Sequence, residues 1–434
     1  MSNPIHSTSA KSVLPMLAMR GLATGLCAGC VVGLLRLSHD RAAARVALWL
    51  EEWREVWWTV PIWFGVLVAL AVILRRIVRE EPLISGSGIP QTELALAGRL
   101  SFTWWRVLLA KFLGSWLALF GGLALGREGP SIQMGGAVGA GFHALWRPAA
   151  PHALTGSPYV VAGAVAGLAA AFGAPAAGVL FAFEEMKSRR DTSLIVAACA
   201  SAIGAHLMIR IVFGMGRILP FAGFEAPPLS SFWIVALEGA VFGVLGVGYN
   251  KTLLWLHDRE AGQTLIPDRW RALPPLLLAG CLALFAPLLI GGGESLIIFV
   301  GEHDVALKTL ILLLAFKYLF AQYSTVASIP GGLLMPILCL GALWGRLWAE
   351  LPVSALAAHG LASGSVQPYV LFGMVSYFAE TVRAPLTGIV LVTEMSGTYT
   401  CLPGSLLAGL IACKVANLLH CPPVYDSLKE RIRL

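Results

Sequence analysis

Charged side chains are scarce in this sequence of 434 residues, and their scarcity excludes an ordinary water-soluble fold. Asp, Glu, Lys and Arg make up 13% of the chain, about half their share in soluble domains, whereas hydrophobic residues make up 57%. Apolar runs recur along the whole chain, at 13–37, 57–74, 112–125, 159–183, 232–249, 273–290 and 403–419. The sequence therefore predicts an all-α protein that crosses a lipid bilayer several times.

Signals for secretion, metal binding and nucleic-acid binding are also missing. Residues 1–11 contain no short hydrophobic region with a small-residue cleavage site, so we expect the first apolar run to remain as a membrane helix. The eight cysteines, including Cys27 and Cys30, lie mostly inside apolar runs, and no H-E-x-x-H spacing groups the histidines. We therefore expect neither a metal nor another cofactor. The net charge of +7 comes from residues that flank apolar runs rather than from one basic face, which argues against nucleic acid as a partner.

The positions of the basic residues predict the orientation of the chain in the membrane. Cytoplasmic loops are enriched in Lys and Arg. Three basic clusters lie beside apolar runs, at Arg75, Arg76 and Arg79, at Lys187, Arg189 and Arg190, and at Lys429, Arg431 and Arg433. They predict cytoplasmic loops and a cytoplasmic C-terminus, although the loop with Arg36, Arg41 and Arg45 weakens the pattern.

Glycine and proline interrupt many of the apolar runs, and some runs are shorter than the roughly 20 residues that a straight span needs. This pattern favours broken and tilted helices over a simple bundle. Lipid cannot satisfy unwound backbone, so such breaks must be buried in protein or line a hydrated cavity. Transporters place their substrates at such breaks, and the pattern is a first indication of transport.

Two groups of residues recur in one register, which indicates an internal repeat. GREGPSIQMG at 126–135 shares its Gly, Pro and Gly with GLLMPILCLG at 332–341, and APAAGVLFAFE at 174–184 shares its Ala-Pro, Gly and Glu with APLTGIVLVTE at 384–394. The offsets, 206 and 210 residues, nearly agree. The alternative is a chance likeness between ordinary glycine-proline helix starts, which are common in membrane proteins.

The repeat predicts how the chain is divided. We expect an N-terminal segment with the first membrane helix at 1–56, a first repeat at 57–225 and a second repeat at 226–434. In transporters built from two repeats, the binding site lies where the halves meet. Whether the second repeat is inverted relative to the first does not follow from the spacing.

Each glycine-proline turn suits an anion. Glycines precede an apolar helix, and a proline near its first position lacks only an N–H group that would have no partner there. The exposed N–H groups and the partial positive charge of the helix end can replace part of a halide's water shell without a full cation. GSGIP at 86–90 is a third such turn, where the Ser87 hydroxyl can donate a hydrogen bond. The alternative for Ser87 is an ordinary helix N-cap.

These motifs together resemble the CLC chloride channel and transporter family, in particular its prokaryotic chloride/proton antiporters. The likeness rests on GSGIP, GREGP, GGLLMP at 331–336, KFLG from Lys111, RAPLTGI at 383–389 and the late Tyr425. It implies two inverted repeats, a homodimer with one anion pathway in each subunit, and a bacterial inner membrane with both termini in the cytoplasm. It also implies that Ser87, Tyr425 and the backbone N–H groups of Leu333 and Leu334 bind the anion.

Two carboxylates carry the implied coupling between chloride and protons. By resemblance Glu128 is the external gate: ionised, it occupies the anion site, and protonated, it leaves. Its alternative is a structural ion pair with Arg127. Glu185 is the implied internal proton acceptor, which distinguishes an antiporter from a passive channel, and its alternative is an interfacial partner of Lys187. Glu184 corresponds to Glu394 in the repeat, and we expect it to be structural.

The sequence departs from the family pattern at one position. Leu334 stands where the family often has phenylalanine, so we expect hydrophobic gating to differ while backbone coordination survives. Ser87 favours chloride over fluoride or nitrate, and we expect no regulatory domain after Tyr425. We expect Lys111 to anchor local polar structure and Glu93 to pair locally.

Three other functions remain open. A passive chloride channel of the same family is the first alternative. The second is an intramembrane hydrolase with Ser87 as nucleophile and a distant base such as His420, for which no motif places a base beside the serine. The third, a membrane scaffold without transport, gives no reason for repeated anion-binding turns.

Overall fold

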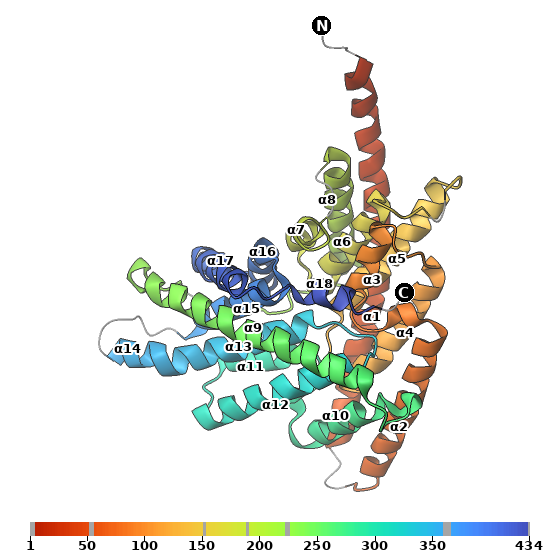
Figure 1. The fold of residues 1–434 in the computed structure, drawn as a ribbon. Coiled ribbons are helices and arrows are strands. Elements are labelled where there is room, and N and C mark those ends of the chain that lie inside the picture. The colour runs from red at the N-terminus through yellow and green to blue at the C-terminus, as the bar shows by residue number, and fades with distance from the viewer. Residues whose placement is uncertain are drawn as a thin grey trace.

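The structure, a computed structural model, is a helical membrane protein whose two halves lie side by side (Figure 1). It describes residues 5–51, 56–150, 153–187, 191–221, 226–358 and 366–432, so Arg189, Arg190 and Arg433 of the basic clusters lie outside the described residues. The first half contains α1 (Ile5–Glu51), α2 (Thr59–Glu80), α3 (Ile89–Leu96), α4 (Trp104–Phe120), α5 (Glu128–Trp146), α6 (Pro158–Phe172), α7 (Pro175–Glu184) and α8 (Thr192–Leu207). The second contains α9 (Phe232–Gly262), α10 (Leu273–Phe285), α11 (Glu294–Glu302), α12 (Leu307–Val326), α13 (Leu334–Trp348), α14 (Ser354–Ala358), α15 (Gln367–Val382), α16 (Pro385–Ser396), α17 (Leu402–Leu418) and α18 (Val424–Lys429).

The expectation of membrane spans and broken helices is confirmed. Seven helical stretches in the described part of the chain are long and apolar enough to cross a membrane. Others, such as α6, α7 and α16, are apolar but only 10 to 17 residues long. Such helices begin and end within the protein, where glycines and prolines allow the backbone to turn.

The predicted repeat is visible in equivalent contacts of the two halves. The Lys111 ammonium donates to the carbonyls of Ile84 and Gly86, both at 2.7 Å. The Lys317 ammonium, 206 residues later, donates to the carbonyls of Leu289 and Gly291 at 3.0 and 2.7 Å. Each buried lysine thus holds the loop that precedes a short helix, α3 in the first half and α11 in the second.

Close helix packing is repeated in the same way. A side chain at Gly163 of α6 would overlap the backbone of Gly135 in α5, and one at Gly373 of α15 would overlap the backbone of Gly341 in α13. Membrane helices associate closely where such small residues meet. The glycines of the repeated motif therefore bring α5 against α6 and α13 against α15.

Two glutamates join the halves at the ends of short helices. Glu184, at the end of α7, accepts hydrogen bonds from the backbone N–H groups of Leu386 and Thr387 in the first turn of α16, at 3.2 and 2.6 Å. Glu394 of α16 accepts from Ala176 and Ala177 in the first turn of α7, at 3.2 and 2.9 Å. A carboxylate is stabilised by the N–H groups and the dipole of a helix start. The exchange is two-fold symmetric, and it confirms that Glu184 is structural and matches Glu394.

The C-terminal helix returns to the first half. Figure 1 shows α18 beside α3, and the two helices are in contact. Arg431 binds Asp258 near the end of α9 at 2.8 and 2.9 Å. The end of α9 and the C-terminal segment therefore lie on one side of the molecule.

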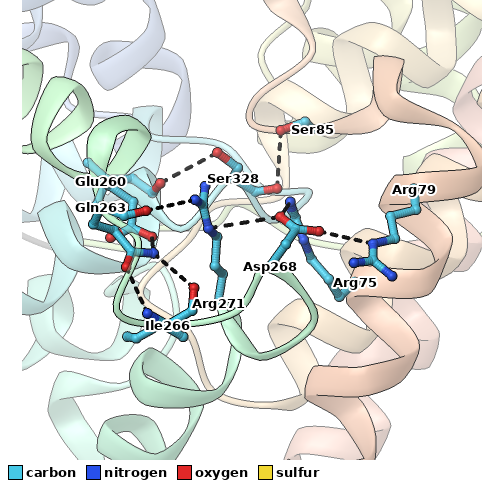
Figure 2. Close-up of polar contacts among 10 residues, drawn as sticks. Arg75, Arg79, Ser85, Glu260, Gln263, Ile266, Asp268, Arg271 and Ser328 are labelled. Carbon is cyan, nitrogen blue, oxygen red and sulfur yellow. Dashed lines mark hydrogen bonds and ion pairs between the residues drawn. The ribbon is translucent and has the colours of Figure 1, made fainter.

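The end of α2 lies on the same side, because the loop between α9 and α10 binds it. Figure 2 shows Asp268 of this loop between Arg75 and Arg79 of α2. Asp268 Oδ1 is bound by Arg75, and Oδ2 accepts from Arg79 Nε at 3.0 Å. Arg271, which lies 3.9 Å from Asp268, donates to the carbonyl of Gln263 at 3.2 Å and thereby closes the loop. The basic clusters of α2 and of the C-terminal segment thus share one side of the protein.

Asp268 provides a test of this link, because it lies outside the membrane-spanning segments. The hydrogen bond from Arg75 lowers the pKa of the Asp268 carboxyl below its ordinary value. A carboxyl with a lowered folded-state pKa stabilises the fold above the unfolded pKa of about 4, and this stabilisation is lost as the pH falls through the folded-state pKa. We expect Asp268→Asn to lower thermal stability at neutral pH by up to about 1 kcal/mol, because water screens a partly exposed pair. The melting temperatures of the two proteins should begin to approach each other below about pH 4 and should coincide once the pH is below the folded-state pKa of Asp268. A difference independent of pH would contradict the assignment.

Candidate functional site

Three glycine turns meet at the centre of the molecule and are hydrogen-bonded to one another. Gly126 and Gly332 exchange two backbone hydrogen bonds of 2.7 Å in an isolated antiparallel bridge. The N–H group of Gly331 donates to the carbonyl of Gly86 at 3.0 Å. The GSGIP, GREGP and GGLLMP turns, far apart in the sequence, therefore form one site from which α3, α5 and α13 begin.

Ser87 lies at the inner surface of this meeting point. Gly88, with a φ of 89°, takes the N-cap position of α3, and Ser87 precedes it, so Ser87 caps the start of the helix only through one side-chain contact. Its Oγ accepts from the N–H group of Ile89 at 3.3 Å, which leaves the hydroxyl proton available for a further acceptor. A side chain at Gly129 of α5 would touch both Cβ and the carbonyl oxygen of Ser87. The glycine of GREGP is therefore needed for the first and second turns to approach.

Leu333 and Leu334 contribute backbone rather than side-chain chemistry. Leu333 is the N-cap of α13, Leu334 is its first residue, and both are buried. The first N–H groups of a helix have no carbonyl partner in a preceding turn. Pro336 follows two residues later and lacks an N–H group, so the free donors of α13 are those of the residues just before it. The predicted anion-binding backbone is therefore present at the meeting point.

Tyr425 reaches the site from the other end of the sequence. It lies in α18 and is fully buried, and its hydroxyl has no hydrogen-bond partner among the described residues. It is within electrostatic range of both Glu128 and Glu185. The structure therefore brings the predicted tyrosine near both predicted carboxylates.

Glu128 is the first residue of α5 and is fully buried. A side chain at Gly126 would overlap its carboxylate and would also touch Met335 in the first turn of α13, so the carboxylate folds back over the bridge between the halves. Neither carboxylate oxygen accepts a hydrogen bond within the described part of the chain. The backbone N–H groups of Glu128 and Met335 are nevertheless close enough to attract the carboxylate. The carboxylate lies where the starts of α5 and α13 face each other.

Arg127 does not pair with its neighbour Glu128. Its guanidinium binds Asp40 of α1 at 3.1 Å and Glu294, the first residue of α11, at 2.6 Å. The alternative of an Arg127–Glu128 ion pair is therefore wrong, because two other carboxylates occupy the arginine. Sequence reasoning missed Asp40 and Glu294, which lie far from Arg127 in the chain and belong to no motif.

A cavity of about 740 Å³ borders Glu128 and Arg127. Its wall includes Leu50 near the end of α1, Trp63 near the start of α2 and Gly292 in the loop before α11. Since α2 runs from this cavity toward Asp268, the cavity opens on the side opposite to the C-terminal segment. It gives the carboxylate of Glu128 a route to that surface.

Glu185 lies near Tyr425, in a cluster of charged groups. It caps the end of α7, is buried, and is within electrostatic range of Glu93 and Asp426. Lys187 binds Asp426 at 2.7 Å, so it does not serve as the ion-pair partner of Glu185. Lys429 binds both Glu93 and Asp426, so Glu93 is paired, but its partner comes from α18 and not from the neighbouring sequence as expected.

Lys111 anchors the GSGIP turn, as expected. Its contacts with the carbonyls of Ile84 and Gly86 fix the loop on which Ser87 lies. Its counterpart Lys317, which sequence reasoning missed, fixes the loop before α11 instead. The shared spacing of 206 residues was the signal that could have identified it.

The two lysines form a matched pair for mutation. Lys111→Met leaves two buried carbonyls without a donor, and each costs about 1–3 kcal/mol, so the Ser87 loop should lose its fixed position. We expect weaker chloride binding by isothermal titration calorimetry for Lys111→Met. Lys317→Met removes the same contacts from the other loop and should bind chloride as the parent does. Equal affinities of both variants and the parent would show that the lysine does not position Ser87.

Comparison with known proteins gives a consistent result. Residues 64–417 match the model of a family described as "Voltage gated chloride channel". The H(+)/Cl(-) exchange transporter ClcA of Vibrio campbellii is 35% identical over 416 residues, which cover 93% of this chain and 87% of the relative. The protein of the same name from Klebsiella pneumoniae is 31% identical over 428 residues, covering 97% and 89%.

Solved structures with the same fold cover nearly the whole chain. A slow cyanobacterial Cl-/H+ antiporter superposes with a TM-score of 0.86 at 28% identity, covering 95% of this chain and 97% of that one. A CLC-type fluoride/proton antiporter superposes with a TM-score of 0.70 at 18% identity, covering 98% and 99%, and supports the fold alone.

Proposed function

The chain belongs to the voltage gated chloride channel family, and from this premise we propose that it is a secondary active antiporter that exchanges chloride for protons across the membrane. The observation that carries the proposal is that Tyr425, a buried hydroxyl without a partner among the described residues, is within electrostatic range of both Glu128 and Glu185. A passive channel needs a route for the anion only. Two carboxylates near one anion site also provide places for a proton to bind.

The anion binds between the hydroxyls of Ser87 and Tyr425 and the backbone N–H groups of Leu333 and Leu334. The support is chemical: Tyr425 has no partner among the described residues, and α13 begins at this point with free N–H groups. Neutral donors and the partial charge of a helix end hold a halide weakly enough to let it leave. Leu334 supplies its N–H group whatever its side chain, so the absence of the usual phenylalanine affects gating rather than coordination.

Glu128 gates the outer side of this site. An ionised carboxylate is itself an anion, and over the facing starts of α5 and α13 it competes with chloride for the same positive field. A protonated carboxyl loses that attraction and moves toward the cavity that borders it. Chloride binding and proton binding are then linked at one residue.

Glu185 accepts protons on the inner side. Its burial near Glu93, Asp426 and Lys429 gives it a route to the charged surface of the C-terminal segment without passing through Ser87. Protons and chloride therefore separate on this side and meet at Glu128.

The two halves act as repeats on either side of this site. We retain the division into an N-terminal segment at 1–56 and repeats at 57–225 and 226–434. The two-fold exchange between Glu184 and Glu394 supports it.

The protein functions as a homodimer in the bacterial inner membrane, with both termini in the cytoplasm. Glu184 and Glu394 lie only partly buried on the α7–α16 face, where their contacts with Leu386 and Ala176 are exposed. Lipid does not solvate carboxylates, so a second subunit over this face removes the cost of exposing them. The orientation is supported by Arg75, Arg79 and Arg431, which lie on one side with the C-terminal segment.

The rival functions have less support. Ser87 makes its one described hydrogen bond with Ile89, and His420 lies in an exposed loop after α17, so no base is placed beside the serine for hydrolysis. A scaffold does not account for an anion-ready site with two buried carboxylates. The passive channel is separated from the antiporter by measurement.

Glu128→Gln tests the gate. Glutamine has the shape of the protonated acid but cannot ionise, so it should leave chloride flow intact and abolish its coupling to protons. The protein is reconstituted into vesicles with an imposed chloride gradient, and chloride and proton movements are recorded together. The parent should move protons uphill, and the variant should not. A variant that pumps protons normally excludes Glu128 as the gate, and a parent that moves chloride without protons is a channel.

Glu185→Gln tests the inner side. Chloride exchange should continue, because the anion does not pass this residue, whereas chloride-driven proton uptake should lose most of its rate. Glu184→Gln is the matched control for proton uptake: it removes the neighbouring carboxylate, which we place in the α7–α16 contact rather than on the proton route. If both variants retain the proton-to-chloride ratio of the parent, Glu185 is not the inner acceptor.

A further inference from the structure

A buried carboxylate that belongs to none of the family motifs lies in the second half. Glu380 of α15 is fully buried where α15 packs against α9. Any side chain at Gly246 of α9 would overlap its Oε2 atom. The glycine therefore leaves a space in the helix contact that this carboxyl group fills.

The carboxyl group of Glu380 has no ion-pair partner within the described residues. Oε2 accepts a hydrogen bond from Thr381 Oγ1 at 2.9 Å, and Oε1 has no donor. Arg383 is near, but its guanidinium donates to the backbone carbonyls of Glu380 and Cys421, at 2.7 and 2.6 Å, and to Asn417. Other ionisable groups around the carboxyl are Tyr377, Cys413 and Cys421.

Burial without a counter-ion determines what this group can do. An ionised carboxylate in an apolar interior is strongly disfavoured unless it is paired, so the resting form of Glu380 carries a proton. Such a group can release that proton only to a neighbour that accepts it. A route for protons must therefore touch Glu380 if the group takes part in transport.

A row of tyrosines provides such a route toward the anion site. Tyr377 lies one helical turn before Glu380 in α15, and the two side chains are within electrostatic range of each other. Its ring packs edge-on against Tyr249 of α9, with ring centres 5.8 Å apart. Tyr249 is within electrostatic range of Tyr425, and α9 and α18, which carry these two residues, are in contact. The hydroxyls of both have no partner among the described residues.

The opposite end of the route reaches the surface. Glu380 lies one turn before the end of α15, where the contact between Arg383 and Asn417 is exposed. This end of α15 adjoins the start of α16, which Glu184 of α7 caps. It is therefore on the side of the molecule from which Glu185 takes up protons in the proposed mechanism.

Resting on the proposed exchange of chloride for protons, we propose that Glu380 is a second inner proton-accepting residue, connected through Tyr377 and Tyr249 to the anion site at Tyr425. A phenol both donates and accepts a hydrogen bond. At each tyrosine a new O–H bond forms on the side of Glu380 as the existing O–H bond breaks on the side of Tyr425, so the ring stays neutral. The ionised carboxylate of Glu128 takes the proton that leaves Tyr425, and Glu380 regains a proton from the inner surface. Bridging water molecules span the gaps between hydroxyls. No oxidant or reductant takes part.

Glu238 of α9 is a matched control. It is also fully buried, and both of its oxygens are without a hydrogen-bond partner among the described residues. The carboxyl group of Glu238 is within electrostatic range of Tyr369, in the first turn of α15. Glu238 lies about two helical turns from Gly246 in α9. It shares the burial of Glu380 without its connection to Tyr377.

The test compares chloride-driven proton uptake in reconstituted vesicles. We expect Glu380→Gln to lower the proton-to-chloride ratio by less than Glu185→Gln does, because Glu185 carries most of the proton uptake, while chloride flux is unchanged. Tyr377→Phe should do the same, and Glu238→Gln should have no effect. In the Glu185→Gln protein, the residual proton uptake should disappear when Glu380→Gln is added. The second route is refuted if Glu185→Gln shows no residual proton uptake. It is also refuted if the residual proton uptake of Glu185→Gln is unchanged when Glu380→Gln is added.

Infrared spectroscopy of the purified protein separates this inference from the proposed function. A protonated buried carboxyl group gives a distinct C=O stretch, and a pH titration should show a band that Glu380→Gln removes and Glu238→Gln keeps. If the parent moves no protons, the exchange function fails, and the infrared titration alone decides whether Glu380 binds one. If no band depends on Glu380, the residue does not hold an exchangeable proton and the inference is wrong.

Discussion

The pair of backbone hydrogen bonds between Gly126 and Gly332 is the constraint on which the site depends. It joins the two halves at equivalent residues, so the turns before α5 and α13 must cross at one point. Side chains are excluded there: a Cβ atom at Gly332 would lie 2.9 Å from the N–H nitrogen of Gly129. Two helix starts then face each other inside the protein, and their partial positive charges add in a volume that water reaches only through gaps. An anion or a carboxylate satisfies that field, and Glu128 begins one of the two helices.

Five of the buried ionisable groups differ in their partners according to the sign of their charge. Lys111, Lys317 and Arg127 are each bound to two oxygen acceptors in the described structure. Glu128 and Glu380 instead have oxygens without donors there. A buried arginine cannot become neutral, and a lysine does so only at a cost, so each must be given partners. A carboxyl group becomes neutral by binding a proton, and an incomplete set of donors keeps that option open. A shortage of hydrogen-bond donors would make a carboxylate a poor structural contact, but it allows the same group to bind and release a proton during transport.

Sequence reasoning predicted the features that depend on local backbone chemistry. Glycine and proline at 126–130, 332–336 and 86–90 indicated helix starts, and all three begin helices that meet at one site. The match of Glu184 with Glu394 indicated that the two residues are equivalent, but not that each binds the start of the other's helix. The partners of Arg127 were not predictable, because Asp40 and Glu294 come from helices whose relative placement no periodicity specifies. Glu380 was missed for a related reason: its significance depends on Gly246, a glycine in another helix at no repeated spacing.

The membrane itself explains why so many of these contacts involve helix ends. In water, the first N–H groups of a helix find solvent at little cost, and a helix start binds an anion only weakly. Within the bilayer, no such solvent exists, so each exposed start must be completed by a protein group or by cargo. α7 and α16 are completed by Glu394 and Glu184, which hold them permanently. α5 and α13 have no permanent partner of this kind, only Glu128, which a proton can release. The difference between a structural helix start and a transporting one therefore lies in whether the carboxylate that completes it can leave.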